Sequence, residues 1–155
     1  MPESVRRLRT NKLKTDREAR TAALFAHGMA SVVGAKVLLA PGEIEDCDFI
    51  TCFTTGGTNN FSCVQLKELA PADLAPAHTI ESLISGLYGL PRSDAVLAIH
   101  LNRRDHITFD RLRVTDVPFA EVWYLWASTP DSATWYLYGD ALKSPTPYEF
   151  AYPHD

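Results

Sequence analysis

The sequence lacks several features that would assign it to a special class of protein. Its 155 residues contain no apolar run of 18 residues, so no membrane-spanning helix is expected. The basic N-terminus lacks the apolar stretch and small-residue cleavage site of a secretory signal, which favours a cytoplasmic location. No internal repeat, low-complexity segment or linker is visible. We therefore expect one globular domain with a core of ordinary size.

Cysteine is also scarce. Cys47, Cys52 and Cys63 are odd in number and form no Cys-x-x-Cys pair, a pattern that argues against a disulfide framework and a structural zinc site. Buried free thiols are the preferred interpretation. Ser62 lacks the motif of a serine nucleophile, and the Gly56-Gly57 loop lacks the lysine of a phosphate-binding loop.

The formal charge of −4 conceals an uneven distribution. Residues 1–20 hold seven Lys and Arg against three Asp and Glu, whereas residues 21–155 hold eight against sixteen. We interpret residues 1–14 as a basic arm that contacts phosphates, with a solvated leader as the alternative. The candidate nucleic-acid-binding residues of this arm are Arg6, Arg7, Arg9, Lys12 and Lys14.

Helical and strand-like patterns alternate over residues 15–155, which predicts a single α/β domain. A capping-box pattern, Thr15-x-x-Glu18, predicts a helix that begins there and ends at Gly34. Further elements are expected as strands at 36–40, 48–54 and 61–66, a helix around 80–87, and strands at 94–101, 122–127 and 134–138. This order predicts a central mixed β-sheet flanked by helices.

The strands at 48–54 and 61–66 are joined by a loop rich in Gly and Asn, which predicts a β-hairpin. If the chain turns between Gly56 and Gly57, Asp48 lies opposite Gln65. If it turns one residue later, Asp48 lies opposite Lys67. Both registers bring an acid, an amide and an amine together on one side of the sheet.

Carboxylate, amide and backbone carbonyl oxygens are the hard ligands that Mg²⁺ prefers, and a nearby lysine can orient a water molecule. The alternative is an ordinary amphipathic strand, whose Lys67 extends to water beside Glu68.

The segments Asp48-Phe49-Ile50 and Val64-Gln65-Leu66-Lys67, with a helix before them and a helix and an apolar strand after them, resemble the PD-(D/E)xK nuclease superfamily. The resemblance is to the variant in which glutamine replaces the second acid, as in catalytic domains of some type IV restriction enzymes. It covers roughly residues 16–101. It implies a restriction endonuclease-like core, helix–three strands–helix–strand (αβββαβ), with extra C-terminal strands.

The resemblance further implies a metal-dependent nuclease that hydrolyses phosphodiester bonds, most naturally of DNA. Asp48 and Gln65 would bind Mg²⁺ or Mn²⁺, the Leu66 carbonyl would be a further ligand, and Lys67 would orient the attacking water. Members often place a glutamate of the first helix at the site, and Glu18 occupies a suitable segment, with the capping box as its competing role. Glu45 or Asp46 could substitute for Asp48.

Two departures from the superfamily pattern keep a second function open. No proline stands directly before Asp48, and Gln65 supplies no charge, so the site would bind metal more weakly. The second hypothesis is therefore an inactive descendant of the fold that acts as an interaction or nucleic-acid-binding module.

Residues outside this motif have two interpretations each. His100 and His106 are read as structural rather than catalytic. Arg103 and Arg104 form a second candidate phosphate-contacting patch or a solvated turn. The aromatic residues of the last two predicted strands are expected in the core or at a homodimer surface.

Overall fold

The computed structural model describes residues 3–42, 47–103 and 108–153. Its elements are α1 (Glu3–Val33), β1 (Leu38–Pro41), β2 (Phe49–Thr55), β3 (Thr58–Leu69), α2 (Ile80–Leu87), β4 (Val96–Leu101), the 3₁₀ turn η1 (Phe109–Leu112), β5 (Glu121–Ala127), β6 (Thr134–Gly139) and β7 (Thr146–Ala151).

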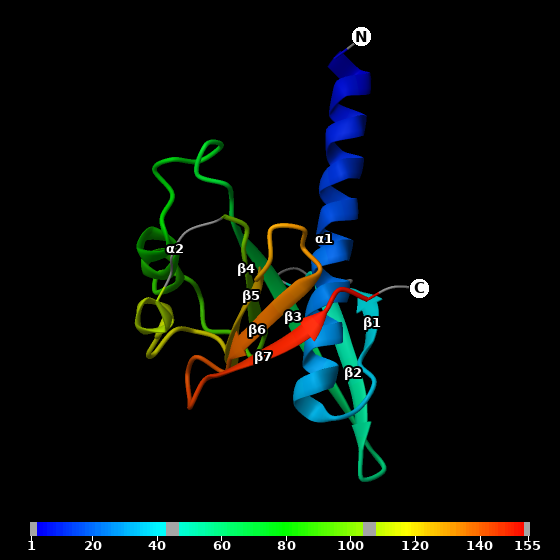
Figure 1. Cartoon of the computed structure of the whole chain (residues 1–155). Helices are drawn as coiled ribbons and strands as arrows, with labels where there is room; N and C mark the ends of the chain where they lie inside the picture. Colours follow the sequence, from blue (N-terminus) through cyan, green and yellow to red (C-terminus); the bar gives the residue numbers. More distant parts are fainter. Residues whose placement is uncertain (1–2, 43–46, 104–107, 154–155) are drawn as a thin grey trace.

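The strands form one mixed, curled sheet in the order β1-β2-β3-β4-β5-β6-β7 (Figure 1). β3, β4 and β5 are parallel neighbours, and every other neighbouring pair is antiparallel. The expected α/β class with a mixed sheet and flanking helices is confirmed. β7 was missed as a separate strand, and β3 extends beyond the predicted 61–66 at both ends.

Helix α1 begins twelve residues earlier than the capping-box pattern predicts. Thr15 and Glu18 lie inside it, so the predicted helix start at Thr15 is wrong. Residues 3–14 contain no Gly or Pro and consist largely of good helix formers, which lets the helix continue through the basic segment. Figure 1 shows this N-terminal part of α1 rising beyond the sheet. The side chains of residues 1–14 lie outside the described part of the structure.

Each face of the sheet is covered by one helix, because side chains alternate between the faces along a strand. On one face, Leu24 and Phe25 of α1 pack against Val64, Trp123 and Leu137. The other face carries α2, whose buried residues are Ile80, Leu83 and Leu87, together with Leu112 of η1. Even-numbered residues of β3 from Val64 onward therefore face α1, and odd-numbered ones face α2.

A capping box is present at the N-terminus of α2. Thr79 accepts a hydrogen bond from the Ser82 amide at 3.1 Å, and the Ser82 hydroxyl accepts one from the Thr79 amide at 2.9 Å. Together with the apolar spacing of the helix, this confirms the predicted second helix.

Most of the C-terminal aromatic residues belong to the core. Trp123, Tyr124, Trp135 and Tyr138 are all buried. The half-buried Trp126 packs against Phe109 and Tyr138. Within the described residues, no helix has the length and apolarity needed to cross a membrane.

Candidate functional site

The β2–β3 hairpin has the first of the two expected registers. Gly56 and Gly57 form its turn with φ values of +55° and +80°, a left-handed conformation that glycine adopts without steric penalty. Thr55 pairs with Thr58 and Phe49 pairs with Val64. Continued by one residue, this register would put Asp48 opposite Gln65.

Asp48 instead lies along the edge of β3, just before β2 begins. Its amide donates to the Val64 carbonyl at 3.0 Å, and its carboxylate oxygen Oδ2 accepts from the Leu66 amide at 2.8 Å. Asp48 and Phe49 thus both oppose Val64, the arrangement of a β-bulge. The Val64 carbonyl and the Leu66 amide, which hold Asp48, belong to the residues on either side of Gln65. Asp48 and Gln65 are therefore neighbours at this point of β3.

The same edge of β3 carries the carbonyl of Leu66, because the N–H and C=O of one strand residue point to the same side. β2 ends its pairing at Val64, whereas β3 continues beside β4 to Leu69. The expected metal ligands Asp48 and Leu66 therefore lie at an edge of β3 that no strand of the described residues covers.

Lys67 does not share that edge. By strand alternation, Gln65 and Lys67 face α2. Lys67 lines a cavity of about 380 Å³ together with His78, Ser82 and Gly86. Neither this cavity nor the larger one described below is lined by Asp48, Gln65 and Lys67 together.

Glu18 lies on α1, which packs on the other face of the sheet. Glu18 and Lys67 therefore lie on opposite sides of the sheet and do not form one site. Glu45 and Asp46, the alternative acids, lie outside the described residues.

The donor atoms at Asp48 are of the type that binds a hard divalent cation, but they carry only one formal negative charge. Asp48 supplies a carboxylate and Leu66 a backbone carbonyl at this edge, both oxygen donors of the type that Mg²⁺ takes. The third expected ligand, the Gln65 side-chain amide, faces α2 by strand alternation. Mg²⁺ commonly binds through one or two carboxylates and completes its shell with water and substrate phosphate oxygens. Within the described residues, no group of three or more His, Cys, Asp or Glu side chains is placed to hold a metal.

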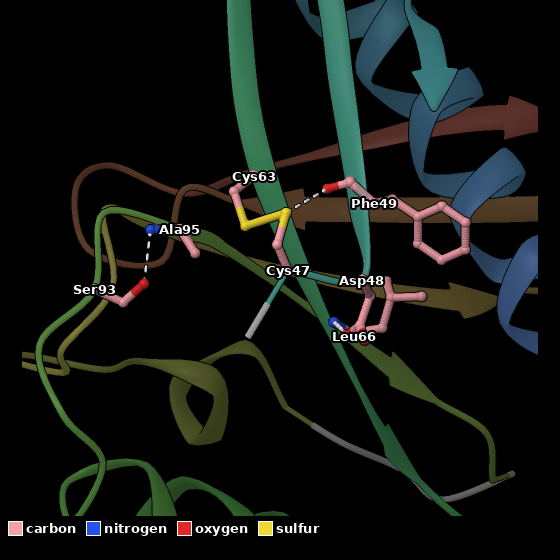
Figure 2. Close-up of a disulfide and its surroundings, with 7 residues drawn as sticks. All are labelled: Cys47, Asp48, Phe49, Cys63, Leu66, Ser93 and Ala95. Atoms are coloured by element: carbon pink, nitrogen blue, oxygen red, sulfur yellow. Dashed lines mark hydrogen bonds between the residues drawn. A yellow bond between two sulfur atoms is a disulfide. The ribbon is translucent and has the colours of Figure 1, made fainter. Parts of the chain in front are cut away.

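A disulfide joins Cys47 to Cys63 and ties the segment before β2 to the middle of β3 (Figure 2). The expectation of free thiols is wrong for these two residues, and Cys52 is free. The physical reason is that the hairpin and its bulge bring the two Cα atoms to 5.5 Å, within the range of a disulfide. The bond fixes the residue directly before Asp48.

A larger cavity, of about 1010 Å³, opens on the face that α1 covers. We call it the α1 cleft. Its walls come from α1, from the carboxyl ends of the parallel strands β3, β4 and β5, and from the β5–β6 loop. Its lining residues include Arg17, Arg20, Glu68, His100, Asn102 and Trp135.

Polar groups at the strand ends of the α1 cleft contact one another. Glu68 and His100 are register partners on β3 and β4. The Asn102 amide donates to Glu68 at 2.9 Å, and Arg17 forms an ion pair with Glu68 at 3.6 Å. The His100 ring lies 5.7 Å from the Trp135 ring.

His100 is electrically neutral at pH 7. Burial lowers its pKa to about 4, because the charged imidazolium is poorly solvated there; Glu68 opposes this shift, and Arg20 and Arg17 add to it. The neutral ring can donate one hydrogen bond and accept another.

Arg20 presents a guanidinium group that is held by two aromatic rings. Its Cζ lies 5.9 Å from the Trp135 ring centre and 5.4 Å from that of Tyr152. Stacking on aromatic rings orients a guanidinium and leaves its N–H edge available for an anion.

The candidate phosphate-binding residues of the sequence fall into three groups. Arg103 donates through Nε and Nη2 to the Ala70 carbonyl, at 2.8 and 2.6 Å, and so stabilises the turn that borders the α1 cleft. Arg104 lies outside the described residues, as does His106, the histidine read as structural. The side chains of Arg6, Arg7, Arg9, Lys12 and Lys14 are also not described, although their backbone belongs to α1.

Sequence reasoning missed Arg20, Glu68 and Asn102 as members of a site. The signal that could have found them is their position, since polar residues at the carboxyl ends of parallel strands commonly line ligand sites. That signal requires knowing that β3, β4 and β5 are parallel neighbours.

Comparison with known proteins assigns no relatives to the chain. No protein family, no curated protein and no solved structure matches it.

Proposed function

We propose that this chain is a metal-dependent nuclease with a restriction endonuclease-like core, acting on phosphodiester bonds of DNA. The observation that carries the proposal is the hydrogen bond from the Leu66 amide to the Asp48 carboxylate. It holds an acid at the central residue of Gln65-Leu66-Lys67, where the superfamily pattern requires one.

The order of the elements supports the proposed core. One helix, three strands, a second helix and a fourth strand follow one another from α1 to β4, and the two helices cover opposite faces. β1, β2 and β3 form an antiparallel meander, and β4 joins β3 in parallel.

Asp48, Gln65 and the Leu66 carbonyl would hold the ion, Mg²⁺ or Mn²⁺. When bound, such an ion supplies Lewis-acid stabilisation of the charge that develops on a phosphoryl oxygen. Asp48 supplies the single formal negative charge of this set. Lys67 would bind and orient water from the α2 side of β3.

A second candidate function is a nucleic-acid-binding or interaction module without catalysis, including pairing with a second copy of the chain. One observation favours it: Lys67 lines a cavity on the α2 side of the sheet, and Asp48 is held at the edge of β3 and does not line that cavity. Both candidates predict binding of nucleic acid or a partner, but only the first predicts bond cleavage.

The experiment that separates them measures Mg²⁺-dependent cleavage of supercoiled plasmid and of labelled single-stranded DNA and RNA. We expect Asp48→Asn and Lys67→Ala to lower the rate at least about 100-fold, a loss typical of removing one catalytic group. Lys36→Ala is the matched control, since Lys36 is an exposed lysine before β1. Equal cleavage by all four proteins, or none by the wild type with Mg²⁺ or Mn²⁺, would refute the nuclease proposal.

We further propose a cytoplasmic location, on the sequence grounds given above. Disulfides are rare in that compartment, so the Cys47–Cys63 bond offers a test. Fractionation of the native host, with thiols trapped at lysis, should find the chain in the cytoplasm; recovery in an oxidising compartment would overturn this proposal.

A further inference from the structure

The α1 cleft has a charge pattern that the proposed catalytic edge does not explain. Arg17 and Arg20 line it from α1, three residues apart and therefore on one side of the helix. Arg6 and Arg9 repeat this spacing upstream, and the separation of eight positions from Arg9 to Arg17 corresponds to about 2.2 helical turns. Four arginine positions thus share one face of a single helix, over about 21 Å at 1.5 Å per residue.

The side chains at the cleft suit an anion better than a cation. Arg17 is 68% exposed in its side chain, so its guanidinium is accessible at the rim of the cleft. Arg20 is oriented by Trp135 and Tyr152. Two acids also line the cleft: Glu68, which is bound by Asn102 and Arg17, and Asp73, which is exposed to solvent. His100 carries no charge at neutral pH.

We propose that the α1 cleft binds the sugar-phosphate backbone of a single nucleic-acid strand, with Arg17 and Arg20 contacting successive phosphates. The choice of nucleic acid as the polyanion rests on the proposed function. The position of the site is inferred from the residues that line the cleft. A single strand fits this geometry, because a groove of about 1010 Å³ between a helix and a sheet has room for nucleotides but not for a duplex.

The polar floor of the cleft adds a means of contacting the bases. His100 and Asn102 lie at the carboxyl end of β4, beside Glu68. A neutral imidazole and an amide can each donate and accept hydrogen bonds, as base edges require.

The test is fluorescence anisotropy with a labelled 20-nucleotide single strand, as DNA and as RNA, and with the matching DNA duplex. EDTA is present, so that no divalent ion supports cleavage. We expect the double variant Arg17→Gln/Arg20→Gln to bind either strand at least about tenfold more weakly. Its plot of log affinity against log salt should be shallower by about 1.4, since each phosphate contact on a single strand contributes about 0.7.

The matched control is Arg92→Gln/Arg111→Gln, which removes the same charge away from the cleft. Arg92 is exposed, and Arg111 pairs with Glu81 of α2 on the other face. We expect this variant to retain the wild-type salt slope, and circular dichroism should show that both variants fold.

An equal loss in both double variants, wild-type binding by Arg17→Gln/Arg20→Gln, or tighter binding of duplex than of single strand would overturn the proposal. Binding of a nucleoside monophosphate alone, measured by calorimetry, would likewise overturn it in favour of a small phosphorylated ligand. The catalytic proposal is tested separately, by the Mg²⁺-dependent cleavage assay, whereas the binding measured here is in EDTA. Strand binding without cleavage would refute the nuclease activity and leave this inference standing.

Discussion

Glu68 and His100 stand side by side on the parallel strands β3 and β4, and both line the α1 cleft. Glu68 favours the charged form of His100, but the loss of solvation on burial has the larger effect and lowers the His100 pKa to about 4. The pair therefore places a negative group beside a neutral one at the floor of the cleft. This relationship has a measurable effect on stability.

Stability should fall as the pH drops from 6.5 towards 4. In the unfolded chain His100 takes up a proton near its ordinary pKa of 6.5, whereas the folded protein resists protonation until about pH 4. The unfolded state thus binds more protons in this window, and the free energy of unfolding decreases by up to roughly 2 kcal/mol between pH 7.5 and pH 5. Urea denaturation at both pH values measures this decrease.

His100→Gln should show a smaller decrease in the free energy of unfolding over this pH range than the wild type does. An unchanged pH dependence in His100→Gln would contradict the role assigned to burial.

Gly28 allows α1 to approach the sheet closely. A Cβ atom there would lie 2.9 Å from Cε1 of Phe150 and 3.1 Å from Cδ2 of Leu137. Crowding of this kind costs roughly 1–3 kcal/mol, more than the gain of up to about 1 kcal/mol from alanine in a helix. We expect Gly28→Ala to destabilise the protein, as measured by urea denaturation.

Gly86 of α2 provides the control, since no heavy atom lies within 4 Å of its hypothetical Cβ. Gly86→Ala should stabilise the protein by up to about 1 kcal/mol. If both substitutions shifted stability in the same direction, the close-approach explanation for Gly28 would fail.

The disulfide should leave one reactive thiol. Alkylation of the denatured, non-reduced protein is expected to modify Cys52 alone, and alkylation after reduction should modify all three cysteines. Cys63→Ser should lower the free energy of unfolding by about 3 kcal/mol, the value expected for closing a loop of this length. Cys52→Ser is the control, and three reactive thiols before reduction would show that the bond does not form.

Asp140 is a buried acid that holds two backbone groups. Its Oδ1 accepts from the amides of Val122 and Leu142, each at 3.0 Å. Asp140→Ala leaves the buried Val122 amide without this partner and should cost roughly 1–3 kcal/mol in thermal or urea unfolding. Asp140→Asn keeps an oxygen acceptor, so its loss should be smaller; equal losses would indicate that charge rather than hydrogen bonding matters.

Local patterns were sufficient for much of the fold. Apolar spacing identified α2 at Ile80, Leu83 and Leu87, and two adjacent glycines identified the hairpin turn and one of its two expected registers. These features depend on interactions between residues close in sequence. The start of α1 was predicted wrongly because Thr15 and Glu18 match a capping box in composition, although helix formers on both sides allow the helix to continue.

The sequence by itself determined the α/β class, the hairpin and the Asp48, Gln65 and Lys67 motif, because each rests on short-range periodicity and turn chemistry. Tertiary structure alone decided which of these groups meet. The bulge at Asp48 places its carboxylate at the edge of β3, whereas Lys67 lies on the face of the sheet that α2 covers. The parallel alignment of β3 and β4 joined Glu68 to His100 across 32 positions of sequence, a contact that no local pattern encodes.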